Sequence, residues 1–344
     1  MGITYKDSAI VFDGEFNKAA YYDVANNDIT AQFDGRGSIS KYAVMNKYSV
    51  FSAYYSLYTI NGRAIDWSET KHVEMVGKRQ ITTFSEKECD IKITQFLDNS
   101  SNCIYVEHEV KAKEDIDFRN VVNFGVDFRS YVEQLPVRLS FSTLCRVVGG
   151  FLKSKKKNKL YIRENGTAYI KGDVMGDFYL DVAISEGAKT LEAERGFTNQ
   201  FGLGGLVKKG ETKSFRYVIS AGTRQDYTYC DVEKALAKFD VAYRETQDYI
   251  KSLKAPENIS DEFLKAYYAS TLNASLSNYK ELGKFKGFLA GIVYQFPART
   301  YYRDAYWTVL SVLPVKPELV RNEILTLANG ISSKGECPSA VKFN

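Results

Sequence analysis

The stretch CIYVEHEVKAK (103–113) decides the fold. Its apolar residues alternate with polar ones, so that Ile104, Val106, His108 and Val110 share one face. A period of two residues is typical of a half-buried β-strand. Because His108 lies within this alternation, we expect it to be a sheet residue and not a ligand.

Other segments of the first two thirds of the chain repeat this pattern. The expected strands are DIKITQFLD (90–98), DFYLDVAIS (177–185) and KSFRYVISAG (213–222). In KLYIRENGTAYIKGD (159–173), Asn165-Gly166 supports the positive φ angles of a type I′ turn, which predicts a hairpin. Helical periodicity is nearly absent before about residue 230, so the sequence predicts a large antiparallel β-sandwich.

Composition narrows the class of protein. The chain has 344 residues, a length that suits two domains, and a net charge of +4, which does not suggest a nucleic-acid partner. Its basic run, 153–159, is expected to be a solvated hairpin edge, with phosphate binding as the alternative. The 25 Tyr and 21 Phe suit sugar binding, although tyrosine is also common in large sheets.

The cysteines and the N-terminus bear on location. Five cysteines are dispersed without CxxC spacing, which favours a reducing cytoplasm and gives no support to a metal site. MGITYKDSAIVF (1–12) lacks the features of a signal peptide. No apolar run approaches the length of a membrane span, so we expect no membrane partner, and we expect no cofactor.

The period changes near residue 230. Apolar residues recur at helical spacing from Asp231 to Leu253, and Pro256 ends this helix. Ser260 is the expected N-cap of a second helix that runs to about Lys280. The first of these helices is interpreted as a connector between the two parts.

Two more helices are expected after a glycine-containing loop (281–300). One begins near Tyr302 and ends by Pro314. The other, 317–331, opens with proline and ends at Gly330, as capping preferences predict. The region from 230 to the last residue is therefore expected to be all helix.

The stretch FPARTYYRDAYW (296–307) places an Arg-Asp pair within an aromatic cluster. An ionised aspartate only accepts hydrogen bonds and an arginine is a fork of donors, so Arg303 and Asp304 can bind neighbouring hydroxyls of one sugar ring. The aromatic platform would come from Phe296, Tyr301, Tyr302 and Trp307. Alternatively, the pair is a partly buried ion pair, or Asp304 complements a helix N-terminus.

Here the sequence resembles the six-hairpin glycosidases, the glucoamylases and glycogen-debranching-like enzymes. The resemblance lies in Tyr302-Arg303-Asp304-Ala305, in the preceding loop GFLAGIVYQFPARTYYRD (287–304), and in GISSKGECPSAVKFN (330–344). It implies three parts: an antiparallel β-supersandwich (1–226), a linker helix (227–257), and the first hairpins of an (α/α)6 barrel (258–344).

The resemblance also implies a function. Arg303 and Asp304 would hold the non-reducing-end glucosyl unit of an α-glucan, and Tyr302, Trp307 and Phe296 would line the pocket. Such enzymes use two carboxyl groups and invert the anomeric centre. Both groups lie on later hairpins, so we expect the chain to stop inside the barrel with its catalytic carboxyl groups outside it. Hairpins left open in this way should expose apolar faces and favour self-association.

Among the acidic residues of the chain, Glu336 is the one with a candidate role. Glu336, in a Gly-Glu-Cys-Pro turn, is either a substrate-contacting carboxylate or a solvated turn residue. Glu318 and Glu323 are expected to be solvated on a helix start and face. Asp177 and Asp181 show no paired arrangement.

Three functions remain open from the sequence. The first is the N-terminal portion of an inverting, exo-acting α-glucoside hydrolase, for which the Arg-Asp pair argues. The second is a non-catalytic carbohydrate-binding or interaction module, favoured by the missing carboxylate pair. The third is an inverting glycoside phosphorylase of the same architecture, which would need a phosphate-binding cluster.

Overall fold

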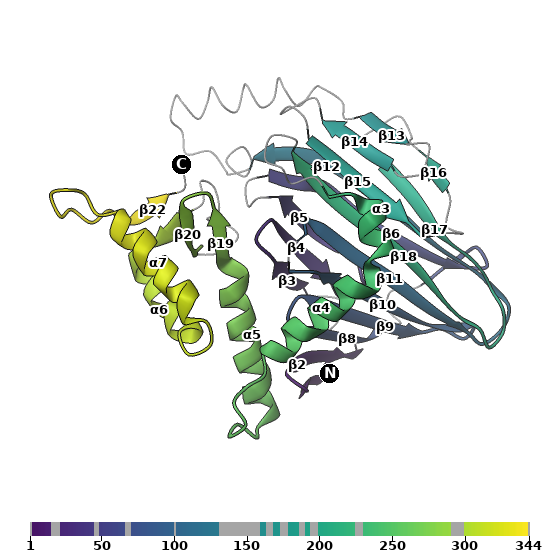
Figure 1. Cartoon of the computed structure of the whole chain (residues 1–344). Coiled ribbons are helices and arrows are strands. Elements are labelled where there is room, and N and C mark those ends of the chain that lie inside the picture. Colours follow the sequence, from purple (N-terminus) through teal and green to yellow (C-terminus); the bar gives the residue numbers. More distant parts are fainter. Residues whose placement is uncertain are drawn as a thin grey trace.

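The computed structural model describes residues 2–14, 21–44, 48–65, 70–99, 101–130, 159–162, 168–172, 178–185, 190–192, 199–223, 230–289 and 299–342. A sandwich of strands forms one side of the molecule and helices form the other (Figure 1). The Asn165-Gly166 turn and the lysines at 153–157 lie outside the described residues. The strands that flank this turn, β13 (Lys159–Ile162) and β14 (Ala168–Gly172), pair antiparallel as a hairpin requires.

Two antiparallel sheets confirm the predicted sandwich. Within the described residues the first has ten strands, in the order β1 (Gly2–Lys6), β2 (Ala9–Asp13), β8 (Thr70–Val76), β9 (Arg79–Ser85), β10 (Cys89–Leu97), β11 (Cys103–Ala112), β18 (Thr212–Thr223), β15 (Phe178–Ile184), β14 and β13. The second sheet has eight strands, β16 (Thr190–Glu192), β17 (Asn199–Val207), β12 (Ile116–Ser130), β6 (Tyr48–Ile60), β5 (Ile39–Val44), β4 (Ile29–Asp34) and β3 (Tyr21–Ala25), with β7 (Arg63–Ala64) on β6.

The inner faces of the two sheets enclose the main core. As predicted, Ile104, Val106 and Val110 of β11 are buried there, together with large rings from both sheets. His108 is fully buried among them, and Tyr58 Oη and Asn120 Nδ2 lie 3.1 and 3.2 Å from its Nε2. The imidazole is therefore part of the core and contacts its polar neighbours through Nε2, as expected for a sheet residue.

Two helices cover the outer face of the ten-stranded sheet (Figure 1). These are α3 (Val232–Ala237) and α4 (Phe239–Ser252), which we call the connector. The sequence predicted a single helix here, but it breaks at Lys238. Phe96 and Tyr105 of the sheet stack at 4.9 Å, and Phe239 meets Phe96 edge-on at 5.3 Å. The connector thus buries an aromatic surface that the sheet would otherwise expose to water.

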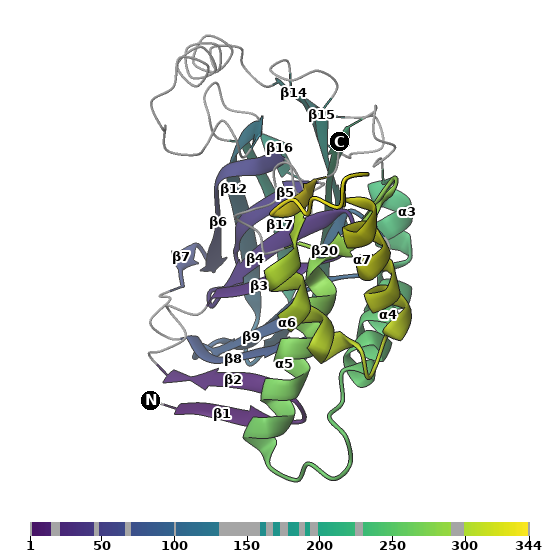
Figure 2. The ribbon, with the colours of Figure 1, turned by 90° about the vertical axis from the view of Figure 1, so that its left-hand side faces the viewer.

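In the described residues after the connector there are three further helices: α5 (Glu262–Asn278), α6 (Tyr302–Val312) and α7 (Pro317–Asn329). Figure 2 shows α5 beside the β1–β2 edge of the sandwich, where Phe263 meets Tyr5 edge-on at 5.1 Å. The N-cap of α5 is Asp261, not Ser260, because its carboxylate accepts the Leu264 N–H at 2.9 Å. No helix in the described ranges is long and apolar enough to cross a membrane.

The expectation that everything after residue 230 is helical is wrong. A hairpin joins β19 (Tyr279–Leu282) to β20 (Phe285–Phe288), and Gly283, at φ +59°, supplies the positive φ that its two-residue turn needs. A second pair joins β21 (Arg299–Tyr301) to β22 (Ala340–Lys342). Most of the first hairpin and of β21 falls within the expected loop, 281–300, while β19 begins two residues earlier, at the end of the expected second helix. Strands of three or four residues are too short to show a period in the sequence.

A buried lysine ties α5 to the sandwich. Lys280 is 1% exposed, and its Nζ donates to the carbonyl oxygens of Asn26 and, at 2.7 Å, Ser277. Burial lowers the pKa of Lys280 to about 7. The ammonium group thus joins the end of α5 to the turn between β3 and β4.

We predict that His108 makes the sandwich acid-sensitive. Burial lowers the pKa of His108 to about 3, whereas an unfolded histidine titrates near 6.5. Protons therefore bind the unfolded chain preferentially as pH falls from 6.5 towards 3, and about 2 kcal/mol of unfolding free energy should be lost by pH 5.

Urea unfolding at pH 7 and pH 5 tests this in wild type and His108→Gln, which should lose less stability on acidification. His72→Gln is the matched control, because His72 lies half-exposed on β8 against Asp13 at 2.8 Å. The same acid loss in wild type and His108→Gln would contradict the prediction.

Candidate functional site

The Arg-Asp pair lies in the first turn of α6, open to solvent. The side chain of Arg303 is 88% exposed and that of Asp304 is 39% exposed, and Nε of Arg303 lies 3.2 Å from Oδ1 of Asp304. An exposed pair of this kind contributes little to stability. Its donors and acceptors are accordingly accessible to a ligand.

Two aromatic side chains continue from this pair along α6. Trp307 is one helical turn after Arg303, so both share a face, and it is 67% exposed. Tyr306, which the sequence analysis did not single out, is 57% exposed and meets Trp307 edge-on at 5.1 Å. Its position next to Trp307 in the sequence could have identified Tyr306 as a candidate site residue. Phe296 lies outside the described residues.

Tyr302 fixes the start of α6 to the end of α7. Its hydroxyl donates to the Leu327 carbonyl at 2.7 Å. Gly330 makes room, because a Cβ there would lie 3.0 Å from that hydroxyl and 2.2 Å from Val341 Cγ2. Desolvation and the neighbouring Cys337 thiol raise the pKa of Tyr302. Its hydroxyl is thus engaged by the backbone of α7.

Glu336 lies in an exposed turn between α7 and β22. Its backbone N–H donates to Ser332 Oγ at 3.0 Å, and its carbonyl accepts the Ser332 N–H at 3.0 Å. Among the contacts of the described residues, none joins its carboxylate to Arg303 or Asp304. This position fits the solvated-turn alternative for Glu336.

Glu323 is the residue that sequence reasoning placed wrongly. Expected to be solvated, it is fully buried, because Val320, Glu323 and Thr326 form the buried stripe of α7. This spacing of three residues is typical of one helix face, and it could have predicted that Glu323 is buried. Glu318, on the first turn of the same helix, is exposed as expected.

The Glu323 carboxylate joins β20 and β21 to α7. Its Oε2 accepts the Phe288 N–H at 2.8 Å, and its Oε1 accepts the Thr300 hydroxyl. Gly287 permits the approach, since a Cβ there would lie 2.2 Å from Oε2. Desolvation outweighs these two hydrogen bonds and raises the pKa of Glu323. Because Thr300 lies just before α6, this carboxylate positions the helix that carries the Arg-Asp pair.

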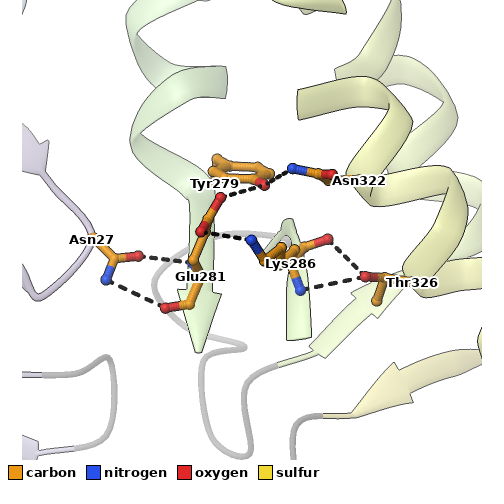
Figure 3. A network of polar contacts seen from close by, with 6 residues as sticks. All are labelled: Asn27, Tyr279, Glu281, Lys286, Asn322 and Thr326. Atoms are coloured by element: carbon orange, nitrogen blue, oxygen red, sulfur yellow. Dashed lines mark hydrogen bonds and ion pairs between the residues drawn. The ribbon is translucent and has the colours of Figure 1, made fainter. Parts of the chain in front are cut away.

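A second polar network joins the same hairpin to the sandwich (Figure 3). The Asn27 amide exchanges hydrogen bonds with the Glu281 backbone, at 2.8 Å to N and 3.4 Å to O. Lys286 Nζ lies 3.1 Å from Oε2 of Glu281, and the Tyr279 hydroxyl donates to its Oε1 at 3.1 Å. On the other side, Asn322 of α7 donates to that hydroxyl at 2.9 Å. The sandwich therefore fixes the hairpin, and the hairpin fixes α7.

Large apolar side chains are exposed on all three of these helices, as the sequence analysis expected of open hairpins. They are Phe263, Leu264 and Tyr267 on α5, Tyr306, Trp307 and Leu310 on α6 with Leu313 at its end, and Ile324 and Leu325 on α7. Each of these is at least 45% exposed. Such surfaces favour association with other apolar surfaces.

Within the described ranges, no group of three or more His, Cys, Asp and Glu side chains is placed to hold a metal ion. The chemistry that the start of α6 can offer is hydrogen bonding by a cation and an anion beside aromatic faces.

No protein-family model matches the sequence, and no curated protein matches it. Among solved structures, "Putative kojibiose phosphorylase from human microbiome" aligns with 96% of this chain at a TM-score of 0.61 and 9% identity. The alignment covers 49% of that protein, so the chain spans about half its length. At this identity the likeness shows a shared fold alone, and it includes both the sandwich and the helices.

Two further structures align with part of the chain. A galactose mutarotase-like protein from Lactobacillus casei covers 59% of this chain and 100% of its own at a TM-score of 0.38 and 9% identity. The aldose epimerase homologue from C. elegans covers 59% and 99% at a TM-score of 0.36 and 9% identity. These TM-scores are too low to carry an argument.

We predict that Glu323→Ala destabilises the helical part by about 2–4 kcal/mol, because it leaves the Phe288 N–H unpaired and opens a void. Glu323→Gln keeps an acceptor for Phe288 and should cost less. Since the pKa of Glu323 is raised in the folded state, wild type should lose stability as pH rises from about 4.3 through that raised value. The Gln variant should not show this loss.

Hydrogen exchange of α7 and thermal unfolding across pH 4–8 measure both effects. Glu318→Ala, an exposed glutamate on the same helix, is the control. Equal stability of Glu323→Ala and Glu318→Ala would contradict the assigned role.

We predict that the exposed apolar face of α6 makes the chain self-associate. Replacing Leu310 and Leu313 by lysine should lower the average mass measured by sedimentation at high concentration. Leu206→Lys, at a 65% exposed leucine on the sandwich, is the matched control and should leave the mass unchanged. A wild-type chain that stays monomeric up to its solubility limit would show the prediction to be wrong.

Proposed function

We propose that this chain is part of a carbohydrate-active protein of the six-hairpin type, and that the start of α6 binds the terminal sugar of an oligosaccharide. The observation that carries the proposal is the solvent-accessible Arg303–Asp304 pair, with Trp307 one turn further along. The shared fold with a protein described as a kojibiose phosphorylase supports it, because the likeness extends over both the sandwich and the helices.

The proposed recognition follows from hydrogen-bonding chemistry. Arg303 donates to sugar oxygens and Asp304 accepts from sugar hydroxyls, while Trp307 and Tyr306 offer flat apolar faces. Phe296 and Tyr302 are proposed as further lining residues, and Glu336 as a more distant contact from its turn. A sugar that lacks one of the recognised hydroxyls would leave a charged group unpaired and bind less well.

The finer activity we propose is cleavage of an α-glucoside with inversion, as in glucoamylases and glycogen-debranching-like enzymes. Inversion requires a general acid and a general base on opposite sides of the sugar. Three helices follow the connector in the described part of the chain, whereas an (α/α)6 barrel has twelve. We therefore assign neither catalytic carboxyl group to a residue in the described part of the chain.

Phosphorolysis is the second candidate, and one observation favours it. The solved structure that shares the fold over 96% of this chain carries the name of a phosphorylase. In such a reaction phosphate would replace water as the attacking group. The sugar subsite at Arg303 and Asp304 would serve both reactions equally.

We predict that Arg303→Ala weakens binding of maltose or kojibiose by about 10–100-fold, the amount expected when charged hydrogen bonds are lost. Saturation-transfer NMR on the chain measures binding, and Arg321→Ala, an exposed arginine on α7, is the matched control. Equal affinity in wild type and Arg303→Ala would remove Arg303 from the site.

We also predict that residues 1–344 alone do not turn over maltose, isomaltose, kojibiose or malto-oligosaccharides, with or without phosphate. Release of glucose or of a sugar phosphate is measured in parallel, so that hydrolysis and phosphorolysis are distinguished. Turnover of either kind would show that the acid and base lie within the chain.

A further inference from the structure

Two cysteines far apart in sequence meet where the connector begins. Cys103 is the first residue of β11, and Cys230 precedes Asp231, the N-cap of α3. Their Sγ atoms lie 2.7 Å apart across a separation of 127 residues. A disulfide bond has a length of about 2.05 Å, so a shortening of about 0.7 Å would complete one.

We propose that Cys103 and Cys230 form a reversible disulfide that fixes the start of the connector to the outer face of the ten-stranded sheet. The site is set by the fold on both sides. Cys103 is fully buried beside Tyr105 and Val218, and Cys230 packs against the same cluster. The Asp231 carboxylate accepts the Lys234 N–H at 3.2 Å, which caps the helix that begins directly after Cys230.

The two sulfurs differ in access. Cys230 is partly exposed, while Cys103 is not. The Cys103 thiol donates to the sulfur of Cys230, which lowers the pKa of Cys230, whereas burial raises the pKa of Cys103. Cys230 is therefore the sulfur that an external oxidant would meet first, and the one with more thiolate character.

The reaction needs a low-molecular-weight disulfide such as oxidised glutathione. The Cys230 thiolate attacks one of its sulfurs, breaks the S–S bond and releases one glutathione thiolate. Cys103 then gives up its proton and attacks the Cys230 sulfur, which releases the second glutathione thiolate. Two cysteines are oxidised, one glutathione disulfide is reduced, and the two protons end on the two glutathione molecules.

Such a bond would constrain a long loop. Closing 127 residues restricts the unfolded chain strongly, and in the native state the two sulfurs already lie 2.7 Å apart. The oxidised chain should melt at a temperature about 5–10 °C higher than the reduced chain. Cys230 directly precedes Asp231, the N-cap of α3. A bond at Cys230 should therefore also slow hydrogen exchange at the start of α3.

The test equilibrates the folded chain in buffers of increasing oxidised-to-reduced glutathione ratio, then unfolds it in urea and blocks all free thiols with N-ethylmaleimide, because Cys103 is buried in the folded chain. Mass spectrometry should find a peptide cross-linked through Cys103 and Cys230, two fewer blocked thiols, and the rise in melting temperature. Cys230→Ser should lose the cross-link and the rise, and Cys337→Ser, at an exposed cysteine, should keep both.

Two results would overturn the proposal. One is blocking of both Cys103 and Cys230 in unfolded wild type after the folded chain has been equilibrated at the most oxidising ratio. The other is a cross-link that leaves the melting temperature and the α3 exchange unchanged. Neither depends on sugar binding or turnover, so the proposed function stands or falls separately.

Discussion

The position of the candidate site depends on one buried carboxylate. Glu323 accepts hydrogen bonds from β20 and β21 at once, and it does so from the buried stripe of α7. These strands border the segment that leads into α6, so their attachment to α7 sets where α6 begins. The cost of burying the charge is reflected in the raised pKa of Glu323. A leucine there would pack, but it would leave the Phe288 N–H without its acceptor.

A second constraint comes from the outer face of the ten-stranded sheet. Phe96, Tyr105 and Val218 form an apolar surface on the side of the sheet away from the sandwich core, and this surface must be shielded from water. The connector supplies it, and its Thr246 hydroxyl donates to the Leu97 carbonyl at 2.9 Å. Because the connector must lie along this face, the chain emerges beside β1–β3, where α5 and Lys280 dock. The sheet thereby determines where the later helices begin.

Much of this architecture could be predicted from patterns of nearby residues. Alternation along 103–113 identified β11 and its buried face, and the change of period near residue 230 identified the helices. The short strands after residue 278 were not predicted, because three or four residues, such as those of β21, are too few to show a period. The burial of Glu323 could have been predicted from its spacing with Val320 and Thr326. Its hydrogen-bond partners, the pairing of Cys103 with Cys230 and the break at Lys238 depend on contacts made only in the folded chain. The Arg303–Asp304 pair could be identified as a candidate site from the sequence because the two residues are adjacent in the chain.

The most direct measurement of the central claim is a crystal structure of the chain with maltose or kojibiose bound. We expect a sugar ring at the start of α6, with hydroxyls within hydrogen-bonding distance of both Arg303 and Asp304 and an apolar face against Trp307. A sugar bound elsewhere, for example along the sandwich, with Arg303 still directed only at Asp304, would contradict it.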